Sequence, residues 1–213
     1  MPGFSRQNPS PDYEALIALY RDLHLGGDRS RGTPAEKTFA GISLLPFVQE
    51  IKEAVDRFGA RTILDYGSGK GKQYERQGLT LPDGRKVKNI PDFWQVKVTC
   101  YDPGYPPHMQ LPKGRFDGVV CTDVLEHCPK EDIPWIVDEI FSFARKFVFA
   151  TVATYPAKKS LPDGRNAHVT IESPEWWRRV FDEAHRENLP FCLTIRCKSD
   201  SIRSGHPVRR AIS

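Results

Sequence analysis

The sequence predicts an α/β fold in which a mostly parallel sheet carries helices on both faces. Short apolar strands such as residues 62–66 alternate with amphipathic segments at helical spacing, which is the pattern of strand–helix–strand units. A glycine-rich stretch follows that first strand directly, as is typical of a ligand-binding sheet. With 213 residues, 39% hydrophobic and 27% charged, the chain is expected to form a single domain, residues 1–213, with a substantial core.

Two helices are predicted before the first strand. Residues 1–11 are rich in Pro, Ser and Asn and are interpreted as a frayed tail. Apolar residues at helical spacing predict a helix over 12–25 and a second helix that ends near Gly59. We expect 12–58 to form an N-terminal helical lid on a core of residues 60–213.

Strands and helices alternate through the rest of the chain. The sequence predicts strands at 62–66, 95–102, 116–123, 146–153 and 191–197, and helices from Gly71, at 133–144 and at 173–188. The last helix begins with Ser173 as N-cap and Pro174 in its first turn. A Pro-Asp-Gly turn predicts a hairpin insertion near 79–90, and the same LPDGR letters at 161–165 are interpreted as repeated turn chemistry.

The stretch ILDYGSGKGKQ, residues 63–73, places three glycines at alternate positions. Glycine lets a ligand approach the backbone without a Cβ in the way, and the helix that follows offers free N–H groups to an anion. Asp102 ends the next strand, where an acid can accept hydrogen bonds from ribose hydroxyls. The alternative is a glycine-rich turn without a ligand. Lys70 and Lys72 are interpreted as solvated residues at the helix start.

Three motifs together resemble the class I S-adenosylmethionine-dependent methyltransferases, whose fold is Rossmann-like. The motifs are DYGSGKG at 65–71, CYDP at 100–103 and FDGVVCTDVLEH at 116–127, of which the last is the most specific. The resemblance covers about residues 60–153. It implies an enzyme that uses S-adenosyl-L-methionine as cofactor and leaves S-adenosyl-L-homocysteine.

The chain departs from this family between its second and third motifs. The span from Asp102 to Phe116 is proline-rich and too short for the helix and strand that the family has there. We therefore expect a sheet that is shortened at this point. The adenine contact cannot be assigned from the pattern, and Tyr105 or Met109 are the options for packing on the ring.

The resemblance implies the cofactor site residue by residue. Asp65 would orient the glycine loop and the cofactor's amino group, with a purely structural cap as the alternative, and Asp102 would hold the ribose hydroxyls. Thr122, Asp123 and Leu125 would lie near the methionine moiety. The full set expected to bind the cofactor is Asp65, Gly67, Ser68, Gly69, Asp102, Thr122, Asp123 and Leu125.

The pocket for the substrate that accepts the methyl group, here called the acceptor side, is expected at residues 154–171 together with residues 12–38. The catalytic residues that we expect are His168, His127 and Tyr155, and His24, Lys158 and Lys159 are further candidate bases. His168 follows the fourth predicted strand, and its imidazole can take a proton near neutral pH. The alternative is a histidine that satisfies a loop carbonyl.

No metal site is expected from the sequence. Asp123, Glu126 and His127 lie close together in the chain and are able to meet a divalent ion. No spacing rule favours that arrangement over hydrogen bonding.

Three functions fit these motifs. The first is methyl transfer to an oxygen or nitrogen of a small polar metabolite, such as a sugar or a nucleotide-linked compound. The second is RNA or DNA methylation, suggested by Lys158-Lys159, Arg178-Arg179 and the segment IRSGHPVRR, although the net charge of +4 is mild. The third is a non-catalytic cofactor-binding protein, against which the intact glycine loop argues. We expect the first.

Composition predicts a cytoplasmic protein. The five cysteines form no CxxC pair, which favours reduced thiols over a disulfide framework or a zinc site. The first residues have no apolar signal region, and no apolar run reaches the length of a membrane span. We expect a small-molecule substrate and no membrane partner, and the sequence leaves the oligomeric state open.

Overall fold

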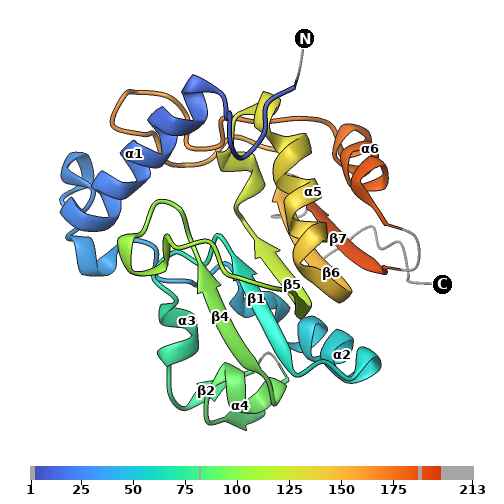
Figure 1. The fold of residues 1–213 in the computed structure, drawn as a ribbon. Coiled ribbons are helices and arrows are strands. Elements are labelled where there is room, and N and C mark those ends of the chain that lie inside the picture. Colours follow the sequence, from blue (N-terminus) through green and yellow to red (C-terminus); the bar gives the residue numbers. More distant parts are fainter. Residues whose placement is uncertain (1–2, 82, 187–188, 198–213) are drawn as a thin grey trace.

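A computed structural model describes residues 3–81, 83–186 and 189–197. Its centre is a five-stranded sheet in the order β4-β1-β5-β6-β7, in which every neighbouring pair of strands is parallel (Figure 1). The strands are β1 (Thr62–Tyr66), β4 (Lys97–Tyr101), β5 (Phe116–Thr122), β6 (Ala144–Ala153) and β7 (Phe191–Arg196). The expected α/β fold with a mostly parallel sheet is therefore confirmed, and it is compatible with a Rossmann-like fold.

Six α-helices accompany these strands in the described part of the chain. They are α1 (Pro11–Gly26), α2 (Val48–Phe58), α3 (Lys72–Glu75), α4 (Ile90–Trp94), α5 (Ile133–Phe143) and α6 (Pro174–Ala184). Short 3-10 turns lie between them: η1 (Arg29–Arg31), η2 (Ala35–Lys37), η3 (Leu45–Phe47), η4 (Pro106–His108), η5 (Leu125–His127) and η6 (Lys130–Asp132). Helix α4 was not predicted, and Asn89 caps it by accepting a hydrogen bond from the Asp92 amide.

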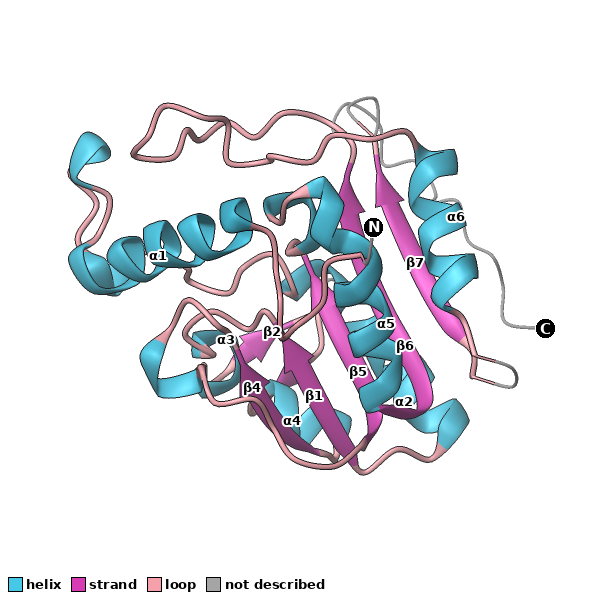
Figure 2. Cartoon of the chain, turned by 45° about the horizontal axis from the view of Figure 1, so that its top comes forward, coloured by secondary structure: helices cyan, strands magenta, loops and turns pink. Residues whose placement is uncertain are grey.

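The helices cover both faces of the sheet. On one face, α5 and α6 pack with β5, β6 and β7 around buried residues such as Ile136, Phe141 and Trp177. On the other face, α2 and α4 bury Ile51 and Trp94 against the sheet. Because α2 belongs to this layer, the part of the expected lid that lies at the carboxyl ends of the strands is the segment from α1 to η2 (Figure 2).

The N-terminal residues are ordered, so the prediction of a frayed tail is wrong for residues 3–11. The Arg6 guanidinium forms an ion pair with Glu139 of α5 and donates to the hydroxyls of Tyr101 and Tyr66 at 2.9 and 3.0 Å. The Ser10 amide donates to the Asp132 carboxylate at 3.0 Å. A partly buried charge with three partners offsets the entropy of ordering this segment, and composition alone does not reveal partners so distant in the chain.

The expected shortening between β4 and β5 is confirmed. The chain passes from Tyr101 to Phe116 with η4 as its one short helical turn and no strand. The expected hairpin is also present, as β2 (Leu79–Thr80) antiparallel to β3 (Lys86–Val87). Helix α6 ends at Ala184, and the predicted residues 187–188 lie outside the described residues. Within the described chain, no helix has both the length and the apolar character that a membrane span requires.

Gly118 in β5 tests how tightly the sheet packs under the site. A Cβ at this position would lie 2.4 Å from the Phe147 ring and 2.8 Å from Ile63. Overpacking of this kind costs about 1–3 kcal/mol, so we expect Gly118→Ala to lower the free energy of unfolding by about that amount in urea denaturation.

Gly26 is the matched control, because a Cβ there meets nothing within 4 Å. Gly26→Ala is expected to change the stability by less than about 1 kcal/mol. Equal stability of the two variants would contradict this packing of β5.

Candidate functional site

The glycine loop after β1 is held against the next strand of the sheet. The amides of Gly67 and Ser68 both donate to the Tyr101 carbonyl, at 2.8 and 3.0 Å. Gly67 has a φ of 81°, and a Cβ there would lie 2.4 Å from Val124. Glycine is therefore required at this position both by backbone conformation and by close packing against the segment after β5.

Asp102, at the end of β4, closes this loop from the other side. One carboxylate oxygen accepts from the Gly69 amide and the other from the Gly104 amide, each at 2.8 Å. The Asp102 side chain is 15% exposed, and burial raises its pKa while the two amides oppose that shift. Because a carboxylate offers about four lone-pair positions, both oxygens keep capacity for a further donor.

Asp65 is buried beneath the glycine loop, with 2% of its surface exposed. Its Oδ2 accepts from Gln73 Nε2 at 2.9 Å and from the Tyr74 hydroxyl at 2.8 Å. Burial raises the pKa of Asp65 to about 7, against the effect of these two hydrogen bonds. This geometry shows the role of a structural cap for the loop and α3. The contact with a cofactor amino group stays a prediction.

Lys70 ties the glycine loop to the N-terminal segment, so its interpretation as a solvated residue is wrong. The side chain is 8% exposed and donates to the Ala35 carbonyl and to Thr38 Oγ1. Lys72 likewise donates to the Glu36 carbonyl. The glycine loop supplies two ammonium groups, and η2 supplies the carbonyl oxygens that accept from them. The two segments are more than 30 residues apart, so the sequence pattern does not reveal this pairing. As a result, the segment 24–39 is fastened directly onto the glycine loop.

An aromatic cluster lies over the glycine loop. The His24 ring stacks on Phe39, with centroids 4.0 Å apart, and lies 5.0 Å from the Tyr105 ring. Burial lowers the pKa of His24 to about 4, so the ring is neutral at pH 7. His24 Nδ1 is buried and has no hydrogen-bond partner among the described residues. Met109, the other option for an adenine contact, is 50% exposed.

His127 and His168 meet at the carboxyl ends of β5 and β6. Their ring centroids are 4.9 Å apart. His127 Nδ1 lies 2.8 Å from the Ala167 carbonyl and also 2.8 Å from the Tyr20 hydroxyl of α1. His168 Nδ1 lies 2.6 Å from the Tyr155 carbonyl. Burial lowers the pKa of His127 to about 4, so that ring too is neutral at pH 7.

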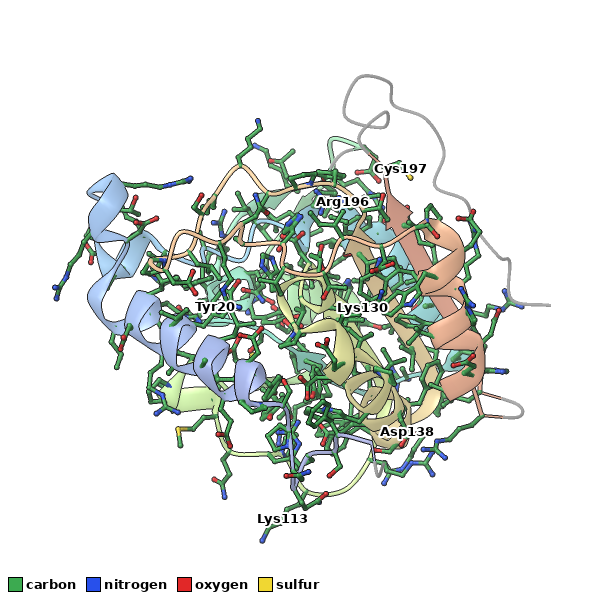
Figure 3. The ribbon with its side chains drawn as sticks, turned by 90° about the horizontal axis from the view of Figure 1, so that it is seen from above. Tyr20, Lys113, Lys130, Asp138, Arg196 and Cys197 are labelled. Carbon is green, nitrogen blue, oxygen red and sulfur yellow. The ribbon has the colours of Figure 1, made fainter. Side chains whose placement is uncertain are left out.

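Charged groups border the two imidazoles. Arg196, the last residue of β7, donates to Asp123 Oδ1 at 3.1 Å and to the Tyr155 hydroxyl at 2.8 Å. Glu126 is fully buried, and burial together with the neighbouring Asp123 carboxylate raises its pKa well above the usual range. Figure 3 looks down on this end of the sheet, with Tyr20 on α1 and Arg196 on β7.

The structure thus brings the three expected catalytic residues together, from η5 and from the loop after β6. Of the expected cofactor residues, Asp65, Ser68, Gly69 and Asp102 lie around the glycine loop. Thr122 and Leu125 are buried, and Leu125 is part of the apolar core.

Sequence reasoning missed Tyr20, Phe39 and Arg196 as site residues. Tyr20 stands at an apolar position of the helix predicted over 12–25, which gives no sign of a polar role. Arg196 carried a usable signal, because it is a charged residue at the carboxyl end of a parallel strand, where ligands bind. Phe39 gave no local signal.

No protein-family model matches this chain, and no curated protein matches it.

Asp65 gives the site a pH signature. Its folded pKa is about 7 against an ordinary value of 3.8, so the folded state binds a proton that the unfolded state has released. The contribution of protonated Asp65 to the free energy of unfolding is therefore complete below about pH 4, and it is lost as the pH rises to about 7. Asp65→Asn mimics the protonated acid. Relative to the wild type, we expect the variant to gain about 1.4 kcal/mol of stability per pH unit across this window.

Urea denaturation of both proteins between pH 4 and pH 9 measures this difference. We expect it to level off above about pH 7, because both states are then ionised. A difference that is constant across the whole range would contradict a buried, protonated Asp65.

Proposed function

We propose that this protein transfers a methyl group from S-adenosylmethionine to an oxygen or nitrogen of a small polar metabolite. The observation that carries the proposal is the hydrogen bond from the Gly69 amide to Asp102, at 2.8 Å. It joins a glycine-rich loop and an acid at the carboxyl ends of two adjacent parallel strands, β1 and β4. This combination supports a nucleoside ligand, because in nucleoside-binding α/β folds an acid at this place accepts hydrogen bonds from the ribose hydroxyls and glycines let the ligand approach the backbone closely.

The residues around the loop fit such a ligand. Asp102 would hold the ribose hydroxyls with its remaining lone pairs, and Tyr105 offers an aromatic face nearby. His24, in the same cluster, is 3% exposed. Its Nδ1 is buried and has no hydrogen-bond partner among the described residues. Buried polar atoms are normally hydrogen-bonded, so an unpaired nitrogen at this place is consistent with a ligand group that completes it.

The acceptor side supplies the groups that a polar substrate would meet. His127, His168 and Tyr155 converge with Asp123 and Arg196 beyond the ends of β5 and β6. Such a site favours hydroxylated or amino substrates, because a ligand that lacks these groups leaves buried polar atoms unpaired. The cofactor would supply an electrophilic methyl, while the protein orients the acceptor and accepts its proton. His168, whose Nδ1 is engaged by a carbonyl, keeps Nε2 for that proton.

Segment 24–39 would exclude water from the reaction. Phe39 Cβ lies 3.4 Å from the position of a Cβ at Gly69, and Lys70 fastens the same segment from below. Cofactor entry therefore requires this segment to move away from the glycine loop. A lid of this kind is common where a reactive centre must be shielded from solvent.

Nucleic acid is supported less well as the substrate. Lys158 lies on the loop after β6, where its carbonyl accepts a hydrogen bond from Arg31. Arg178 lies on α6, where it pairs with Glu175. The basic pairs therefore occupy separate elements, and the segment IRSGHPVRR lies outside the described residues. No observation on the described residues favours this function over the first.

Asp102 tests the cofactor assignment. We expect Asp102→Asn to weaken S-adenosylmethionine binding by about 2–3 kcal/mol in isothermal titration calorimetry, because it removes the charge from a pair of hydrogen bonds. Asp117→Asn is the matched control. Asp117 also accepts two backbone amides, from Arg61 and Thr62, but lies at the opposite ends of the strands.

We expect the control variant to bind the cofactor like the wild type, and thermal unfolding of both variants checks that each is folded. Equal affinity in Asp102→Asn and the wild type would remove Asp102 from the site. A loss of the same size in Asp117→Asn would show that the effect is structural.

A further inference from the structure

The cluster of Asp123, His127 and His168 has the chemistry of a metal site. One potential ligand atom from each of these three side chains lies within 4.8 Å of the other two. The residues come from the turn after β5 and from the loop after β6, so the fold assembles them from distant parts of the chain. Asp123 has a φ of 61°, a left-handed conformation that only a minority of non-glycine residues adopt. The backbone thus holds an unfavourable conformation at the residue that supplies the carboxylate.

Both imidazoles are oriented as metal ligands are. A carbonyl oxygen can only accept a hydrogen bond, so the contacts to Ala167 O and Tyr155 O place the ring proton on Nδ1 in each histidine. A ring that carries its one proton on Nδ1 keeps a lone pair on Nε2, which is the atom left for a metal. A backbone carbonyl that accepts from the second ring nitrogen is the usual way in which proteins fix the tautomer of a ligating histidine.

Glu126 provides an independent observation at the same place. The side chain is fully buried, and its Oε1 accepts from the Ala153 amide at 2.8 Å. Its Oε2 is buried and has no hydrogen-bond partner among the described residues. The carboxyl lies beside that of Asp123. Asp123 pairs with Arg196, whereas Glu126 Oε2 has no donor, and a cation beside the two carboxyl groups would give that oxygen a partner.

We propose that Asp123, His127 and His168, with Glu126 as a fourth donor, bind a divalent first-row transition metal. Two imidazole nitrogens with carboxylate oxygens suit Zn²⁺, Fe²⁺ or Mn²⁺, whereas Mg²⁺ and Ca²⁺ prefer sites made of oxygen alone. A four-coordinate ion with bonds of about 2.1 Å holds its ligands about 3.4 Å apart. The ligand atoms of Asp123, His127 and His168, which lie within 4.8 Å of one another, would therefore have to approach one another around an ion.

A role for this metal in the reaction rests on the proposed function. A cation here would lower the pKa of an acceptor hydroxyl bound to it, so that the oxygen attacks the methyl carbon after its proton has left to solvent. The C–O bond would form as the C–S bond breaks, with the electron pair of that bond remaining on sulfur. His168 would then be a ligand and not the general base, and the substrate would be a hydroxyl compound.

The test uses the chelator-treated full chain without cofactor or substrate, so its outcome does not depend on methyl transfer. Zn²⁺ is titrated by calorimetry, and Co²⁺ is followed by its visible absorption bands. We expect one ion per chain in both titrations and at least tenfold weaker binding of Mg²⁺. His168→Gln and Asp123→Asn, which preserve side-chain size, are expected to weaken Zn²⁺ binding at least tenfold. His185→Ala removes an exposed histidine elsewhere and is expected to have no effect.

Thermal unfolding in the presence of chelator shows which variants are folded. If only one of His168→Gln and Asp123→Asn is folded, its Zn²⁺ affinity alone decides the test. Binding that is absent from the wild type, or that stays unchanged in both folded ligand variants, would overturn the proposal. Loss of Zn²⁺ binding in His185→Ala would do the same, because the ion would then bind elsewhere. Metal binding with no S-adenosylmethionine affinity would uphold this site and overturn only the proposed reaction.

Discussion

The hydrogen bond between the Gly69 amide and the Asp102 carboxylate is the constraint on which the candidate site depends. It connects the ends of β1 and β4, two strands whose register places Tyr66 beside Tyr101. The carboxylate that caps the loop is therefore also the group aimed at a ligand above it. A charge held by backbone amides in a nearly buried position is fixed in direction, and such preorganisation is what a binding site requires.

Two layers of contacts build on that constraint. The Lys70 ammonium and the His24–Phe39 stack bring the N-terminal segment down onto the glycine loop. Tyr20, on α1 just before that segment, lies within hydrogen-bond distance of His127, so the N-terminal part contacts both the glycine loop and the acceptor side. Motion of α1 together with segment 24–39 would therefore act on both halves of the site. The ion pair between Arg6 and Glu139 holds the residues that precede α1 against α5.

The sequence was informative where chemistry is local. The glycine spacing, the acid at the end of β4 and the short span before β5 are features of contiguous residues, and the structure places all of them as expected. The two LPDGR segments are another example: in each, the leucine amide donates to the arginine carbonyl, at 2.8 and 2.7 Å. Turn chemistry of this kind depends on four or five neighbouring residues and can be recognised without tertiary contacts.

Other features could not be predicted because they depend on partners far apart in the chain. Lys70 looked solvated because it stands at the start of a helix, yet its ammonium group donates to the Ala35 carbonyl and to the Thr38 hydroxyl, more than 30 residues earlier in the chain. The N-terminal residues looked disordered because their partner, Glu139, lies in α5. Asp123, His127 and His168 showed no metal spacing, because the third member follows an intervening helix and strand. Local pattern predicts elements, whereas burial and pairing are properties of the assembled sheet.

Hydrogen–deuterium exchange with and without S-adenosylhomocysteine shows whether the cofactor binds at the glycine loop and Asp102. We expect slower amide exchange at two separate places, the glycine loop with Asp102 and the covering segment 24–39, because the ligand would bind beneath that segment. Protection there with unchanged exchange at the distant hairpin, 79–87, would place the cofactor as proposed. Unchanged exchange at the glycine loop under saturating ligand, or protection confined to other elements, would contradict it.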